Sequence, residues 1–201
     1  MKIKSMFVKS FFLLTCFSLV ASKAFCGGTV TGTINASMPK FKKDAVVYLK
    51  GVKGPFAAPQ AHGVVDQKNL VFVPHVLAVP VGTTVDFKNS DKVNHNIFSA
   101  DVCKKFNLGT YNPGMSKPVL FDKPCVVNLL CNVHSEMSGF VVVLENPYFS
   151  VSGADGKFTI GNVPPGTYEV GVWSEKLKLK EKTMVTVADK QTASLALNIS
   201  K

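Results

Sequence analysis

The chain has 201 residues, of which 46% are hydrophobic, and a formal net charge of +10. This length and apolar content suffice for one large domain or two small ones, and they exclude an intrinsically disordered chain. Every basic residue is a lysine. Because nucleic-acid binders use arginine for bidentate contacts with bases and phosphates, the absence of arginine argues against a nucleic-acid partner. We interpret the charge as a solvated lysine-rich surface that favours acidic partners.

Residues 1–24 have the layout of a secretory signal peptide. Residues 1–9 carry three lysines and no acid, residues 11–21 form an almost unbroken apolar run, and Ser22-Lys23-Ala24 supplies a small-x-small cleavage site. A stable membrane span needs about 20 apolar residues, which is more than this run offers. We therefore expect cleavage, a periplasmic or secreted chain without a stable membrane span, and a remaining charge of +6 once the four lysines of the leader are removed.

Four cysteines remain after Cys16 leaves with the leader. Export places them in an oxidising compartment, where disulfides persist. Four cysteines allow three pairings, and the sequence leaves all three open. If Cys131 binds a metal, Cys103 and Cys125 are the expected disulfide pair, and Cys26 is an odd thiol near the new N-terminus.

Short strands separated by turns are expected along the whole chain after the leader. In residues 25–53, one alternating run and one β-rich run predict two strands. Residues 54–63 contain two prolines and no periodicity, which is typical of a linker. Residues 64–145 show no long helical period with caps. Short strands at regular spacing predict a β-sandwich or barrel there, and the expected strands are residues 70–80, 83–88, 95–99, 119–122, 126–131 and 139–145.

Residues 146–201 form a second all-β unit. Asp155-Gly156 is a hairpin signal, and Pro164-Pro165-Gly166 is a turn signal. The motifs D-G-x-F-x-I and P-P-G-T-Y in this unit, with G-x-V-x-G and V-V-Y-L near the N-terminus, closely resemble the carboxypeptidase-regulatory-like, transthyretin-like sandwich. The resemblance implies one small sandwich built from residues 25–53 and 146–201, with residues 64–145 inserted. A simple tandem, in which the N-terminal strands join the central domain, is the alternative.

Cys131, His134 and Met137 place a thiolate, an imidazole and a thioether at three-residue spacing. Soft sulfur ligands combined with imidazole suit copper. Structural zinc takes four cysteine or histidine ligands rather than a thioether. A covalent haem needs C-x-x-C-H, and a binuclear copper centre needs a second loop cysteine; the chain has neither. These three residues therefore predict a mononuclear copper site, which needs one further histidine from elsewhere in the chain.

His95 is the expected second imidazole among the four histidines. It follows the strand at residues 83–88 after one turn, which can bring it beside the end of the strand that precedes Cys131. His62 lies in the linker. His75, beside a proline in an apolar run, is expected to be structural.

These ligands and their surroundings resemble the cupredoxin family. The resemblance rests on the strand at residues 81–89, the motif Asn94-His95-Asn96-Ile97 and the C-x-x-H-x-x-M loop, which is similar to that of amicyanin and of methylamine-utilisation-protein-like chains. It covers residues 64–145 and implies a Greek-key β-sandwich with one type 1 copper ion. It also implies that His95, Cys131 and His134 are the equatorial ligands and that Met137 is the axial ligand. The backbone N–H of Asn96 is then the donor to the cysteine sulfur, and His134 exposes the ring edge through which electrons pass.

We therefore predict an all-β, non-enzymatic, periplasmic blue copper protein that exchanges single electrons with a redox protein. Cysteine–histidine catalysis would need a base oriented by a third group, and multicopper enzymes use further histidine clusters, whereas this chain has no H-x-H. The alternative is a copper-binding interaction module, in which the second sandwich recognises a partner and the copper is structural or stored.

Overall fold

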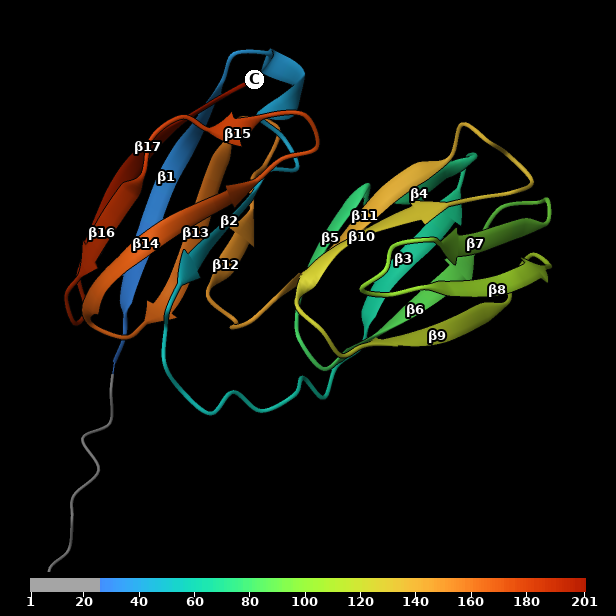
Figure 1. The fold of residues 1–201 in the computed structure, drawn as a ribbon, viewed down its shortest axis with the longest axis horizontal. Helices are drawn as coiled ribbons and strands as arrows, with labels where there is room; N and C mark the ends of the chain where they lie inside the picture. Colours follow the sequence, from blue (N-terminus) through green and yellow to red (C-terminus); the bar gives the residue numbers. More distant parts are fainter. Residues whose placement is uncertain (1–25) are drawn as a thin grey trace, which may run out of the picture.

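The computed structural model describes residues 26–201, which fold into two β-sandwiches (Figure 1). The one helical element is a short 3-10 turn, η1 (Pro39–Phe41), so the prediction of an all-β fold is confirmed for the described residues. The signal peptide expected at residues 1–24 lies outside this range. Within it, none of the helical segments has the length and apolar character that a membrane crossing requires.

The outer sandwich is built from both ends of the described chain. Its two sheets have the strand orders β13-β1-β17-β15 and β12-β2-β14-β16. The strands are β1 (Gly28–Ala36), β2 (Val46–Lys50), β12 (Phe149–Val151), β13 (Lys157–Val163), β14 (Gly166–Trp173), β15 (Lys178–Leu179), β16 (Thr183–Val187) and β17 (Thr192–Ser200). Because β1 pairs antiparallel with β13 and parallel with β17, the N-terminal strand shares a sheet with C-terminal strands.

The central sandwich contains the strands from β3 to β11. Its sheets have the orders β5-β11-β10-β7-β8 and β4-β3-β6-β9. The strands are β3 (Gly63–Lys68), β4 (Val71–Val73), β5 (Val76–Pro80), β6 (Thr83–Asn89), β7 (His95–Ser99), β8 (Phe106–Tyr111), β9 (Ser116–Phe121), β10 (Cys125–Leu130) and β11 (Ser138–Leu144). The segment between β2 and β3 runs from one sandwich to the other (Figure 1).

Residues 70–80, expected as one strand, form two strands that belong to different sheets. β4 pairs with β3, and β5 pairs with β11. The break falls at Pro74, which has no N–H to give to a strand ladder. The chain therefore crosses from one sheet to the other at this point, and the single-strand prediction was wrong.

The two sandwiches pack on each other through a layer of apolar side chains. In β2, Val47 lies in the outer core and Val46 lies in the layer between the sandwiches. In β11, Val143 lies in the central core and Val142 lies in that same layer. Because successive side chains point to opposite faces of a strand, a strand with two buried faces is a continuous apolar run. This accounts for the sequences V-V-Y-L and V-V-V-L.

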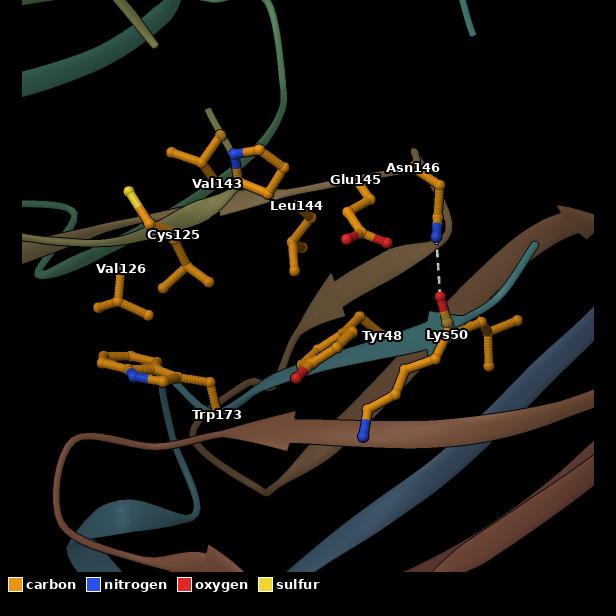
Figure 2. A pocket seen from close by; sticks show the side chains of 12 residues that line it. Tyr48, Lys50, Cys125, Val126, Val143, Leu144, Glu145, Asn146 and Trp173 are labelled. Carbon is orange, nitrogen blue, oxygen red and sulfur yellow. Dashed lines mark hydrogen bonds between the residues drawn. The ribbon is translucent and has the colours of Figure 1, made fainter. Parts of the chain in front are cut away.

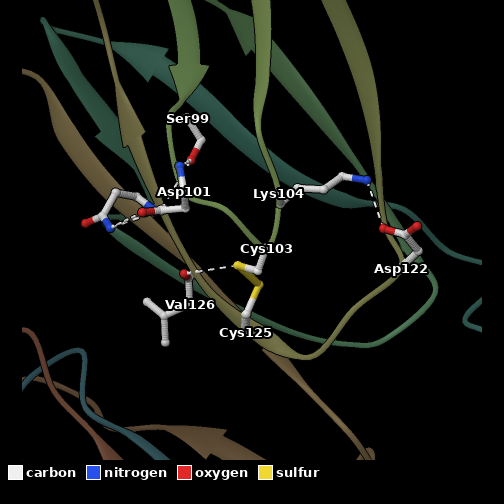
Figure 3. The surroundings of a disulfide bond; sticks show 8 residues. Ser99, Asp101, Cys103, Lys104, Asp122, Cys125 and Val126 are labelled. Carbon is white, nitrogen blue, oxygen red and sulfur yellow. Dashed lines mark hydrogen bonds and ion pairs between the residues drawn. A yellow bond between two sulfur atoms is a disulfide. The ribbon is translucent and has the colours of Figure 1, made fainter.

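A disulfide between Cys103 and Cys125 ties the loop after β7 to the first residue of β10 (Figure 3). The same loop is held by Asp101, which accepts a hydrogen bond from the backbone N–H of Asn128 in β10. Within residues 26–201, Cys26 and Cys131 are the free cysteines, the first exposed and the second buried. The disulfide therefore anchors one end of the strand whose other end leads to Cys131.

Replacing both Cys103 and Cys125 with serine is expected to lower the free energy of unfolding of the central sandwich by about 3 kcal/mol, because the bridge closes a loop over a separation of 22 residues in the unfolded chain. Guanidinium denaturation followed by circular dichroism measures this loss. Cys26→Ser is the control and should leave the transition unchanged. Equal stability of the double variant and the parent chain would contradict the prediction.

Candidate metal centre

The loop between β10 and β11 is closed by strand pairing at both of its ends. Leu130, the last residue of β10, pairs with Ser138, the first residue of β11. Inside the loop the backbone N–H of Met137 donates to the carbonyl of His134 over 3.1 Å. Cys131 and Met137 are both buried and belong to one core cluster. The loop thus turns both of its sulfur-bearing side chains inward.

His95 meets this loop because it is the first residue of β7, which pairs with the end of β10. Its side chain is fully buried. Its Nδ1 lies 4.0 Å from the Sγ of Cys131 and 3.1 Å from the Nδ1 of His134. One ligand atom from each of these three residues lies within 4.8 Å of the other two. The structure therefore brings together three of the predicted ligands, and Met137 lies in the same buried cluster as Cys131.

Asp91 orients the His95 ring from the side away from the loop. Its Oδ2 lies 2.8 Å from the Nε2 of His95. Its two oxygens also accept the backbone N–H groups of Asn69 and Leu70 at 2.6 and 3.0 Å. Burial acts to raise the pKa of Asp91, but the hydrogen bonds from Leu70, His95 and Asn69 outweigh it and lower this pKa below its ordinary value. Asp91 is therefore an ionised acceptor for His95.

The donor set fits a soft metal ion. An ionised Asp91 accepts a hydrogen bond from the Nε2–H of His95, which assigns a lone pair to Nδ1 of that ring. That lone pair faces the nitrogen of His134 and the sulfur of Cys131. The Nδ1 atoms of His95 and His134 lie 3.1 Å apart, and the position of the proton on His134 decides whether they share a hydrogen bond or together face a cation. Two imidazoles with a thiolate and a thioether are a copper donor set.

Asn96 connects β7 to the loop in a way that the sequence did not indicate. Its side-chain Oδ1 accepts the backbone N–H of Asn132 over 3.3 Å, and its Nδ2 donates to Oδ1 of Asn107 over 2.9 Å. Asn96 thus holds the residue that follows Cys131. The bond from its own backbone N–H to the cysteine sulfur stays a prediction.

Sequence reasoning did not single out Asp91. The available signal was its spacing of four residues before His95, with Asn89 as the first residue of its turn. The Nδ2 of Asn89 donates to the carbonyls of Val93 and Tyr111 at 3.0 and 3.2 Å, which fixes the turn from inside. Asn89 is therefore a positioning residue for the segment that carries both Asp91 and His95.

Tyr111 lies beside the centre as the cross-strand neighbour of His95. Burial raises the pKa of Tyr111 far above its ordinary value, although the hydrogen bond from Gln67 acts in the opposite direction. The phenol accepts from Nε2 of Gln67 over 2.6 Å and donates to the carbonyl of Phe87 over 3.3 Å. It therefore stays neutral and adds a rigid wall without adding charge.

The two remaining histidines lie outside the cluster. His62 is exposed, and its Nδ1 lies 3.0 Å from a carboxylate oxygen of Asp86. His75 has its Nδ1 at 3.2 Å from the carbonyl of Ser138 and its Nε2 at 3.1 Å from Glu175. Because Glu175 belongs to the outer sandwich, His75 links the two sandwiches instead of binding at the centre.

Comparison with known proteins finds partial matches. A family model described as polysaccharide lyase family 4, domain II matches residues 136–195. No curated protein matches the chain. A purple cupredoxin from Nitrosopumilus maritimus is 31% identical over 41% of this chain and 99% of its own, with a TM-score of 0.37.

Two further solved structures show likenesses of the same kind. A Cu-containing nitrite reductase from Thermus scotoductus SA-01 is 25% identical over 57% of this chain and 28% of its own, with a TM-score of 0.42. A methionine-to-alanine mutant of amicyanin in the Cu(I) state is 22% identical over 49% of this chain and 98% of its own, with a TM-score of 0.39. Each likeness thus extends over only part of the chain.

Replacing Asp91 with asparagine is expected to weaken copper binding about 10- to 100-fold, because the ring of His95 loses the carboxylate that fixes its tautomer and orientation. Competition with a chromophoric chelator measures the affinity. Asp122→Asn is the control, since Asp122 is exposed and pairs with Lys104 away from the centre. An unchanged affinity in a folded Asp91→Asn protein would show that Asp91 does not support the site.

Proposed function

We propose that the chain is a single-electron carrier in which His95, Cys131 and His134 hold one type 1 copper ion, with Met137 as the axial ligand. The observation that supports this most is the convergence of one ligand atom each from His95, Cys131 and His134 within 4.8 Å, at one end of the central β-sandwich. A copper ion bound there supplies one-electron Cu(II)/Cu(I) chemistry. The partial likeness to cupredoxins agrees with this proposal but does not carry it.

The chain's own residues make such a centre rigid and dry. His95 has no exposed side-chain surface, and Met137 and Cys131 are 1% and 5% exposed. Asp91 and Asn96 hold the ring of His95 and the backbone after Cys131 by hydrogen bonds. A donor set that is fixed before the metal binds cannot rearrange freely when the oxidation state changes. Low rearrangement favours fast electron transfer over chemistry at an open coordination position.

His134 is the side chain through which electrons would leave and enter. It is partly exposed, whereas His95 is buried. Its loop neighbour Val133 is 46% exposed, and Val93, in the turn that precedes His95, is 44% exposed. Exposed apolar side chains on these two segments, which carry His134 and lead to His95, favour close approach of a redox protein. We propose a partner with acidic groups around its contact surface, and a periplasmic or secreted location for both proteins.

A second candidate function is favoured by the outer sandwich, which has a core of its own. Under this alternative, the outer sandwich recognises a partner and the copper is structural or stored. Met137→Leu should then leave partner binding unchanged. Loss of cellular electron flow in that variant would count against the alternative and in favour of the carrier.

Cu(II) added to the mature protein is expected to produce an intense visible absorption band from charge transfer between the Cys131 thiolate and copper, because that sulfur is a ligand. The band should be absent in Cys131→Ser. Cys26→Ser is a matched control, since Cys26 is the other free cysteine of the described chain and is exposed. A colourless Cu(II) complex of the parent protein would end the carrier proposal.

Replacing Met137 with leucine is expected to raise the reduction potential, because loss of the thioether donor disfavours the electron-poor Cu(II) state more than Cu(I). Leucine has a similar volume, so the buried packing is kept. Spectroelectrochemical titration measures the potential. Met115→Leu serves as the control, since Met115 is 46% exposed and is not among the proposed ligands. An equal potential in Met137→Leu and the parent would remove Met137 from the ligand set.

A further inference from the structure

A cavity of about 350 Å³ lies where the two sandwiches meet, away from the metal centre. One side is formed by β2 and β14 of the outer sandwich, and the other by β10 and β11 of the central sandwich. Figure 2 shows the side chains that line it, among them Tyr48, Lys50, Val126, Leu144, Glu145 and Trp173. Its volume lies in the range of small-molecule sites, and junctions between domains are preferred places for such sites.

The aromatic part of the cavity comes from the outer sandwich. Tyr48 and Trp173 are both only partly buried, although they lie in a layer of apolar contacts. The ring of Tyr48 lies against the backbone of Gly171, where a Cβ atom would collide with it. Trp173 packs on Phe140 with ring centroids 5.0 Å apart. These contacts hold the two rings in place and leave part of their surface open to the cavity.

Two charged residues line the cavity, and only one of them, Lys50, has an ion-pair partner in the described residues. The Nζ of Lys50 lies 2.7 Å from the Oε1 of Glu169, and this hydrogen bond raises the pKa of Lys50. The Nδ2 of Asn146 donates to the carbonyl of Leu49 over 2.8 Å. Within residues 26–201, the carboxylate of Glu145 has neither a hydrogen-bond partner nor an ion-pair partner. Glu145 is exposed, so the cavity has an apolar floor and, at its solvent-facing rim, a carboxylate without a protein partner in the described residues (Figure 2).

We propose that this cavity binds a small organic cation, a primary amine on an aromatic body. The ammonium group would pair with Glu145, and the aromatic body would be buried between Tyr48, Trp173 and the aliphatic residues of β10 and β11. A cation also gains from the faces of aromatic rings, which attract positive charge. An anion of the same shape would be repelled by Glu145, and a neutral analogue would lack the ion pair.

This site is separate from the proposed electron-transfer function. The cavity touches β10 at Cys125, its first residue, whereas Cys131 follows the opposite end of that strand. At about 3.3 Å per residue, the two places are roughly 20 Å apart. The proposal therefore holds whether or not the metal centre carries electrons, and it is tested without copper.

The intrinsic fluorescence of Trp173 reports on the cavity, because it is the one tryptophan of the chain. The metal-free mature protein is titrated at low ionic strength with 2-phenylethylamine, 2-phenylethanol and phenylacetate. The amine should give a saturable fluorescence change, which isothermal calorimetry reproduces. The alcohol should bind about two- to fivefold more weakly, and the acid more weakly still, because neither can form an ion pair with Glu145.

Glu145→Gln keeps the size of the side chain and removes its charge. It should weaken amine binding about two- to fivefold, as expected for an exposed ion pair, and abolish the preference for amine over alcohol. Glu181→Gln is the control, because Glu181 is exposed like Glu145 but does not line the cavity. The proposal is overturned if the amine gives no saturable change, if the alcohol binds as tightly as the amine, or if Glu145→Gln binds the amine as tightly as the parent protein.

Discussion

The burial of β11 on both faces is the constraint on which the rest of the structure depends. One face of β11 packs in the central core and the other packs against the outer sandwich. The β10–β11 hairpin therefore has little freedom to shift, and its connecting loop is held by the pairing of Leu130 with Ser138. Because this loop carries Cys131, His134 and Met137, the packing between the sandwiches also limits where these side chains can lie. The outer sandwich thus supports the centre although it contributes no ligand.

The contact between Asp91 and His95 adds the electrostatic part of this arrangement. A buried imidazole beside the sulfur of Cys131 could adopt either tautomer, and only one of them presents the Nδ1 lone pair to the loop. The ionised carboxylate selects that tautomer, and the backbone N–H groups of Asn69 and Leu70 hold the carboxylate. Packing places the ligands and Asp91 prepares one of them, so the site is organised before a metal binds.

Sequence patterns predicted the parts of the molecule that depend on local chemistry. Three-residue spacing in the loop identified Cys131, His134 and Met137, and alternating runs predicted most strands of the β-rich regions. Contacts between distant segments were harder to predict from the sequence. β8 contains Gly109 at positive φ and several exposed residues, so its apolar pattern is weak. The support of His95 by Asp91 and the place of Glu145 at the rim of a cavity between the sandwiches depend on which groups meet in space, and no periodicity records that.

Anomalous diffraction at the copper edge, from crystals of the copper-loaded mature protein, tests the central claim most directly. The account predicts one copper peak between the Nδ1 atoms of His95 and His134 and the Sγ of Cys131, with the sulfur of Met137 on the axial side. A peak at another place in the protein, or a copper ion at this loop without Cys131 and His95 among its ligands, would contradict the account.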